Sequence, residues 1–129
     1  MRMKKILIAD DENSLRFLLR KTLEGDGFNI IEAENGKQAL AMAQKQTPDL
    51  IILDVVMPDL YGSEVCEKLR KQPKTARIPI IIITANVNLY NEDQAKASGA
   101  DYYITKPFSP LKLKSLAHQI LAGDKRSVS

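Results

Sequence analysis

The sequence predicts one α/β domain built on a doubly wound, five-stranded parallel sheet, with helices covering both faces. Short runs rich in Ile, Val, Leu or Tyr alternate five times with segments of helical spacing. The most apolar runs are continuous, which is typical of strands buried on both faces. A length of 129 residues with 44% hydrophobic content fits one compact domain, and we expect no second one.

The strands are expected at residues 4–9, 28–33, 50–53, 78–83 and 101–105. The first, third and fourth runs are the most purely apolar, so they should be central. The second and fifth carry Glu32 and Asp101, which indicates edge strands. With right-handed crossovers, this pattern favours the spatial order 2-1-3-4-5.

Helical patterns separate the strands. The expected core-facing residues are Leu15, Leu18, Leu19 and Leu23 in the first helix, Ala39, Leu40 and Ala43 in the second, Val65 and Leu69 in the third, and Leu113, Leu116, Ala117 and Ile120 in the last. Asn13 and Ser109 are predicted to cap the first and last helices. The fourth helix, from about Leu89 to Ser98, is the most polar, and Gly99 is its expected stop.

Composition narrows the functional classes. The single Cys66 excludes an internal disulfide and lies in a helical pattern, where we expect a packed side chain. The basic start, Met1 to Lys5, is followed by only four apolar residues before Asp10, which is too short for a signal peptide. No run approaches the roughly 20 apolar residues of a membrane helix. We therefore expect a cytoplasmic protein without membrane contact.

The net charge of +3 comes from 19 basic and 16 acidic residues. The basic side chains, Arg16 and Arg70 among them, are spread along the chain without interleaved aromatic residues. Stacking on single-stranded nucleic acid therefore has little support. We interpret these side chains as a solvated basic surface, with weak contact to an acidic partner as the alternative.

Residues able to do phosphoryl or metal chemistry end four of the apolar runs. Asp10-Asp11 follows the first run, Asp54 the third, Thr84 the fourth and Lys106 the fifth. Parallel strands end along one edge of the sheet, where open α/β sheets build their binding sites. The sequence thus predicts a pocket that holds three carboxylates, a hydroxyl and an ammonium.

Three carboxylates in one pocket need a cation, because two unit charges about 4 Å apart repel by roughly 4 kcal/mol near a protein surface. Mg²⁺ suits Asp10, Asp11 and Asp54, since it takes a few carboxylate oxygens and leaves positions for phosphate oxygens. Lys106 and Thr84 would complete a clamp for a phosphoryl group in transfer. The predicted nucleophile is a carboxylate, and Asp54, alone at the end of the middle strand, is the central candidate.

Four sequence motifs stand in a diagnostic order. They are Asp10-Asp11, Asp54-Val-Val-Met57-Pro58 followed by Gly62, Thr84-Ala85, and Lys106-Pro107-Phe108, with Tyr103 three places before the lysine. Together they resemble the receiver domain of a two-component response regulator, and the four in order are a strong signal. The resemblance covers roughly residues 3 to 122. Residues 123–129 are then a flexible tail or the stub of a linker.

The resemblance implies how the acidic residues act. Asp54 would accept a phosphoryl group from a phosphohistidine. Asp11 would bind Mg²⁺ directly, and Asp10 would bind it directly or through water. Asp54 and the backbone carbonyl of Val56 would complete the protein ligands.

The resemblance also implies roles for the residues around the acids. Thr84 and Lys106 would contact the phosphoryl oxygens, and Thr84 and Tyr103 would act as the switch. The peptide bond before Pro107 would be cis, which an X-Pro sequence permits. The state of the switch would be read on the surface made by the fourth helix, fifth strand and fifth helix.

The implied function is a signalling switch that catalyses its own phosphorylation and slow dephosphorylation, not an enzyme with a separate substrate. Its expected partners are a sensor histidine kinase or phosphotransfer protein, and a downstream target protein or a missing output domain. A phosphorylation-dependent homodimer is a further alternative. We expect no direct nucleic-acid binding by this domain.

Three other functions are weighed against this one. A flavodoxin-like cofactor binder would share the fold, but it needs a Gly/Ser/Thr-rich phosphate loop where this chain has Asp10-Asp11-Glu12. An aspartyl-phosphate hydrolase would resemble an Asp-x-Asp nucleophile motif after the first strand, whereas the acids here are adjacent. A pseudo-receiver would have lost phosphorylation, and the complete set of five pocket residues weighs against it.

Overall fold

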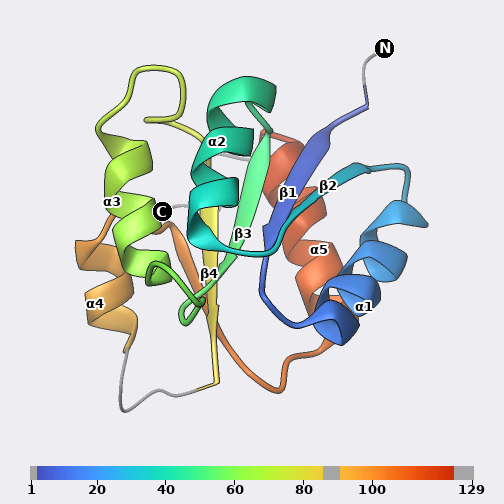
Figure 1. The fold of residues 1–129 in the computed structure, drawn as a ribbon. Helices are drawn as coiled ribbons and strands as arrows, with labels where there is room; N and C mark the ends of the chain where they lie inside the picture. Colours follow the sequence, from blue (N-terminus) through green and yellow to red (C-terminus); the bar gives the residue numbers. More distant parts are fainter. Residues whose placement is uncertain (1–2, 86–90, 124–129) are drawn as a thin grey trace.

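The computed structural model describes residues 3–85 and 91–123. Its strands are Lys5–Ala9 (β1), Asn29–Ala33 (β2), Leu50–Asp54 (β3), Ile80–Thr84 (β4) and Tyr102–Thr105 (β5). Its helices are Asn13–Glu24 (α1), Gly36–Gln46 (α2), Gly62–Arg70 (α3), Glu92–Ala97 (α4) and Pro110–Leu121 (α5). The strands form one parallel sheet in the order β2-β1-β3-β4-β5, which confirms the predicted topology (Figure 1).

The sheet lies between two helical layers, with α2, α3 and α4 on one face and α1 and α5 on the other (Figure 1). Strand β1 shows how one strand serves both layers, because Leu7 and Ala9 join the first core cluster while Ile6 and Ile8 join the second. Every residue of β3 and β4 is buried, whereas β2 and β5 are partly exposed. The predicted central and edge strands are therefore confirmed.

Three helices start at a side-chain cap that is typical of helix N-termini. The side chains of Asn35, Asn91 and Ser109 each accept a hydrogen bond from a backbone N–H three residues on. The prediction that Asn13 caps α1 is wrong. Glu12 occupies that position, and Asn13 begins the helix.

Two further expectations about helices are corrected. Leu18 is 44% exposed, and the buried residues of α1 are Arg16, Leu19 and Leu23, because they are spaced at helical intervals on one side of the helix. Helix α4 is shorter than predicted, and the expected start at Leu89 lies outside the described residues. Its end is close to the prediction, since Gly99 follows with a φ of 105°, a conformation that favours glycine.

Cys66 is buried in the core on the α3 side of the sheet, as predicted, and burial raises the pKa of its thiol to about 11. The thiol therefore stays protonated at neutral pH and behaves as a packing group. Among the helices of the described residues, none has both the length and the apolar character needed to cross a membrane.

Candidate functional site at the carboxyl edge of the sheet

The predicted pocket residues lie at one edge of the sheet. Asp54 ends β3 and Thr84 ends β4, while Asp10 follows β1 and Lys106 follows β5. The Nζ atom of Lys106 lies 3.4 Å from Oδ1 of Asp54 and 3.5 Å from Oδ2 of Asp10. The peptide bond between Lys106 and Pro107 is cis. The structure thus brings together an ammonium and two carboxylates from three separate strand ends.

Asp10, Asp11 and Asp54 form a carboxylate cluster. One oxygen of each lies within 4.8 Å of the others. Asp10 is only 3% exposed and Asp54 only 8%, whereas Asp11 is exposed. The Oδ1 atom of Asp10 accepts a hydrogen bond of 2.8 Å from the backbone N–H of Glu12, which fixes its orientation. The cluster therefore has a buried base and a side open to solvent at Asp11.

Burial dominates the electrostatics of this cluster. The pKa of Asp54 is raised to about 6, first by burial and then by repulsion from Asp10, although Lys106 opposes both effects. Burial also raises the pKa of Asp10, against the Glu12 hydrogen bond and the attraction of Lys106. Burial lowers the pKa of Lys106, but the two carboxylates outweigh it and the net shift is upward. One ammonium does not neutralise the cluster.

The donor set of the cluster fits a hard divalent cation. Mg²⁺ prefers carboxylate and carbonyl oxygens and keeps several of its waters, and three carboxylate oxygens this close match that preference. Asp10, Asp11 and Asp54 would hold the ion. Val56 lies in the loop after β3, where it pairs with Tyr61 in an antiparallel bridge. Its carbonyl as a further ligand stays a prediction.

The loop between β3 and α3 is fixed by close backbone contacts. A Cβ atom on Gly62 would lie 2.4 Å from the carbonyl oxygen of Asp54, so only glycine fits at this position of the predicted motif. The carboxylate of Asp59 accepts hydrogen bonds of 2.7 and 2.9 Å from the backbone N–H groups of Gly36 and Lys37. The loop is thereby tied to the N-terminus of α2 and holds the end of β3 in place.

Thr84 and Tyr103 share one face of the sheet. Side chains alternate along a strand, and Ile80 and Ile82 belong to the core cluster on the side of α2, α3 and α4, so Thr84 faces that side as well. Tyr103 is the register partner of Ile82 and packs, half-buried, against the same cluster. Thr84 itself is fully buried. Their predicted roles in phosphoryl contact and switching stay predictions.

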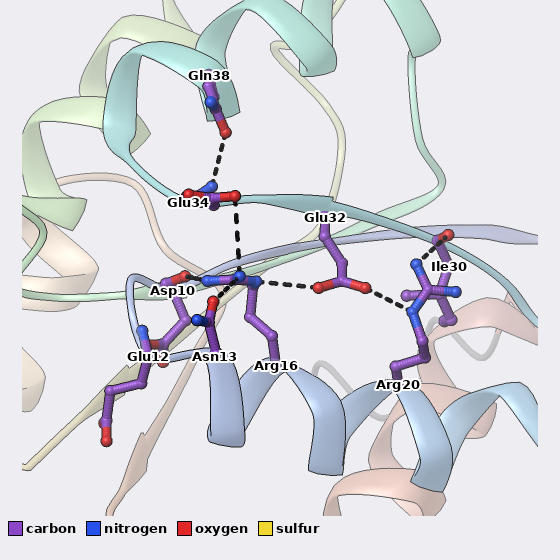
Figure 2. A network of polar contacts seen from close by, with 9 residues as sticks. All are labelled: Asp10, Glu12, Asn13, Arg16, Arg20, Ile30, Glu32, Glu34 and Gln38. Carbon is purple, nitrogen blue, oxygen red and sulfur yellow. Dashed lines mark hydrogen bonds and ion pairs between the residues drawn. The ribbon is translucent and has the colours of Figure 1, made fainter.

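Arg16 is a site residue that sequence reasoning missed. We predicted a solvated surface cation, but it is only 7% exposed. Its guanidinium donates to the backbone carbonyl of Asp10 at 2.6 Å and to Oε1 of Glu32 at 2.9 Å. It also donates to the side chain of Asn13, and Figure 2 shows the three partners around it. The available signal was its spacing, since Arg16 stands three residues before the buried Leu19 on α1.

The sheet order alone does not identify the class of protein, because cofactor-binding proteins share it. The residues of the pocket distinguish between these classes of protein. An acidic cluster at the end of β1 would repel the phosphate of a nucleotide or flavin, whereas three carboxylates facing one lysine are the arrangement expected of a receiver-type signalling domain. The family is shown by comparison with known proteins. The model of the response regulator receiver domain matches residues 6–118, and this chain belongs to that family, which acts in two-component signalling.

Individual relatives agree with this assignment. The chain is 43% identical over 118 residues to the alkaline phosphatase synthesis transcriptional regulatory protein PhoP of Bacillus subtilis, an alignment that covers 92% of this chain and 48% of PhoP. Its fold matches the chemotaxis response regulator CheY4 of Vibrio cholerae with a TM-score of 0.85 and 34% identity, over 92% of this chain and 99% of CheY4. The chain spans between 9% and 55% of other curated relatives at about 40% identity.

A third relative bears on the metal. The receiver domain of the sensor histidine kinase PA1611 from Pseudomonas aeruginosa PAO1 has a TM-score of 0.86 and 26% identity, over 94% of this chain and 99% of that domain. That structure holds a magnesium ion coordinated in its active-site cleft. A protein of the same fold can therefore hold magnesium in its active-site cleft, and the acidic cluster of this chain can be compared with that site.

Proposed function

We propose that this domain is a phosphorylation-controlled switch in which Asp54 accepts a phosphoryl group in the presence of Mg²⁺. The observation that carries the proposal is the 3.4 Å approach of the Lys106 ammonium to Asp54 inside a cluster of three carboxylates. Asp10 is a poorer nucleophile, because one of its oxygens is engaged by the backbone of Glu12. Asp11 is exposed and suits a metal ligand that meets the ion from solvent.

The proposed phosphoryl transfer forms one P–O bond and breaks one bond to the leaving group. A carboxylate oxygen of Asp54 attacks the phosphorus of a phosphohistidine or a small acyl phosphate, and the bond to the leaving group breaks as the new P–O bond forms. The leaving group departs with the electron pair and takes up a proton from solvent. Lys106 would contact a phosphoryl oxygen and stabilise its charge. Bound Mg²⁺ would supply the remaining positive charge, and attack of water on the acyl phosphate would later reset the switch slowly.

The output of the switch is proposed to pass through Thr84 and Tyr103. A phosphoryl group on Asp54 adds charge and three acceptor oxygens, which would draw the Thr84 hydroxyl inward and vacate space for Tyr103. Both residues lie on the sheet face that α4 covers, and Tyr103 lies on β5, which supports a readout at α4 and β5. The proposed readout surface extends to α5, which packs on the other face of the sheet. The partners would be a histidine kinase or phosphotransfer protein, and either a separate target or an output domain attached to the tail.

Intact-mass analysis tests the acceptor directly. In MgCl₂ and a small acyl phosphate or phosphoramidate, the wild type should gain one phosphoryl group, and chelation or Asp54→Asn should abolish the gain. Glu67→Gln is a matched control, because it removes an exposed carboxylate of the neighbouring helix α3 that does not belong to the acidic cluster. Phosphorylation at another residue, or none at all, would replace this proposal with that of a pseudo-receiver.

A further inference from the structure

Arg16 is a buried cation whose nitrogen atoms contact three segments of the chain (Figure 2). Its Nη1 donates to the carbonyl of Asp10 in the acidic loop at 2.6 Å, and its Nε donates to Glu32 on β2 at 2.9 Å. Its Nη2 donates to Asn13 on α1 and lies 4.0 Å from Oε2 of Glu34. The guanidinium therefore joins the acidic loop to both a helix and an edge strand.

The Glu32 end of this network is itself anchored. Nε of Arg20 donates to the second carboxylate oxygen of Glu32 at 2.5 Å, and Arg20 also pairs with Glu24 at 2.8 Å. Burial raises the pKa of Glu32, but the hydrogen bonds from Arg20 and Arg16 outweigh burial and lower it. Glu32 thus stays ionised at neutral pH. A rotation of the Arg16 side chain would have to break a charge-assisted hydrogen bond to a fixed partner.

The contact with Asp10 acts on the backbone. The carbonyl that Arg16 holds belongs to the peptide unit joining Asp10 to Asp11, and a peptide unit is planar. The N–H of Asp10 donates to the carbonyl of Ala33 at 3.1 Å, so the backbone of Asp10 is held on both sides. The directions of the Asp10 and Asp11 side chains depend on this peptide unit.

We propose that Arg16 is a positioning residue for the metal site. It holds the peptide between Asp10 and Asp11 so that their carboxylates converge with Asp54 before any ion arrives. The inference rests on the metal site of the proposed function and adds the group that preorganises it.

The two possible roles of Arg16, as a nearby charge and as a positioning group, predict opposite changes in Mg²⁺ affinity when Arg16 is replaced. If charge alone mattered, removing the Arg16 cation should strengthen the binding of a divalent ion, because two cations near the same cluster repel each other. Loss of positioning should weaken binding, and outer partners of metal ligands typically change metal affinity by about 10 to 100-fold. The sign of the change in the Mg²⁺ dissociation constant therefore separates the two.

The experiment titrates the folded chain with MgCl₂ alone and follows the backbone amide shifts of Asp11 and Asp54 by NMR. Arg16→Gln is expected to raise the Mg²⁺ dissociation constant about 10 to 100-fold. Arg16→Lys should also weaken binding, because one ammonium keeps the charge but lacks the fork that reaches several partners. Lys21→Gln is the matched control, since it removes the same charge from the same helix at an exposed position, where the ammonium lies over the Phe17 ring rather than against Glu32 or Asp10. It should change the constant less than about threefold, well below the effect expected for a ligand-positioning partner.

Three outcomes would overturn the inference. They are an Arg16→Gln protein that binds Mg²⁺ as tightly as the wild type or more tightly, an Arg16→Lys protein with unchanged affinity, and a Lys21→Gln protein weakened as much as Arg16→Gln. Arg16→Lys carries the test if Arg16→Gln does not fold. A wild type that binds Mg²⁺ and is phosphorylated, beside unaffected Arg16 variants, would refute the inference alone. A wild type that does neither would refute the proposed function as well.

Discussion

The amino edge of the sheet, where the strands begin, and the carboxyl edge, where they end, differ in how well their charges are matched. At the amino edge, Arg70 donates to the carbonyls of Gly99 at 2.8 Å and Ile78 at 2.7 Å, and to Oδ2 of Asp101 at 2.8 Å. The same carboxylate oxygen accepts a hydrogen bond of 2.9 Å from the N–H of Ile80. Cation, anion and carbonyls are matched there, so this edge contributes stability.

At the carboxyl edge, a single ammonium faces two buried carboxylates and an exposed third one. The raised pKa values of Asp10 and Asp54 show that the folded chain holds these two buried charges at a cost. The comparison teaches that the matched charges at the amino edge stabilise the fold, whereas the unmatched carboxylates at the carboxyl edge lower its stability. The carboxyl edge is therefore the one with capacity to bind a cation. Substitutions at the two edges should therefore move stability in opposite directions.

The largest expected effect lies at the amino edge. Arg70→Ala would leave three backbone carbonyls and Asp101 without their guanidinium partner, at a cost of about 3 to 4 kcal/mol in the free energy of unfolding. Urea denaturation measures this, with Lys68→Ala as an exposed control on the same helix. The Mg²⁺ affinity of the Arg70→Ala protein should stay at the wild-type level. A cost below about 1 kcal/mol would mean that the amino edge is not the stabilising one.

The carboxyl edge should show the opposite sign, and it should depend on pH. The folded-state pKa of Asp54 is raised from 3.8 to about 6, so the folded state holds this proton more tightly than the unfolded state does. Stability from this group is present below about pH 4 and is lost as pH rises to about 6, with a total of about 3 kcal/mol from a shift of roughly two units.

Urea denaturation of the wild type and Asp54→Asn in chelator between pH 4 and 8 isolates that term, because all other titrating groups are common to both proteins. The stability of Asp54→Asn relative to wild type should grow across this range, and the variant should have the higher free energy of unfolding at pH 7. A lower free energy of unfolding for the variant at pH 7 would show that Asp54 carries no penalty in the folded chain.

Mg²⁺ should relieve the penalty at the carboxyl edge and leave the amino edge unaffected. At about a hundredfold excess over its dissociation constant, a ligand that binds only the folded state adds about 2.7 kcal/mol. Wild type and Arg70→Ala should gain alike, and Asp54→Asn should gain less at the same ion concentration because one ligand charge is gone. Thermal unfolding with and without MgCl₂ is the measurement. If Mg²⁺ does not stabilise the wild type, the acidic cluster does not bind this ion.

The sequence predicted the acidic cluster at the carboxyl edge but not the arginines that hold the chain around it and at the amino edge. Asp10, Asp54 and Lys106 were predictable because each stands at the end of an apolar run, and parallel strands end together. Arg16 and Arg70 were misread as surface charges. Asp10 and Glu32, which Arg16 contacts, and Asp101, which Arg70 contacts, lie 6, 16 and 31 residues away in the chain. Helical spacing predicts burial within one helix but does not reveal such distant partners.

The errors in α1 have the same origin. A leucine pattern cannot show that Arg16 is buried on the side of Leu19 and Leu23, because its guanidinium is held there by the ion pair with Glu32 on β2. The placement of central and edge strands, by contrast, was predictable from composition, since fully apolar runs are buried on both faces, and the right-handed crossover rule then favoured the observed order.

The smallest expected effect links the carboxyl edge to the α4 side of the sheet. Thr84→Ala should leave phosphorylation of Asp54 in place, because neither the acceptor nor Lys106 is altered. It should suppress the shift changes that phosphorylation causes around Tyr103, because the hydroxyl proposed to follow the phosphoryl group is gone. NMR spectra of the phosphorylated proteins measure this, with Thr105→Ala as the control, since Thr105 is the exposed register partner of Thr84. If Thr84→Ala leaves the Tyr103 response at full size, or if the wild type shows no response there, then the phosphoryl signal leaves the pocket by a route that does not include Thr84.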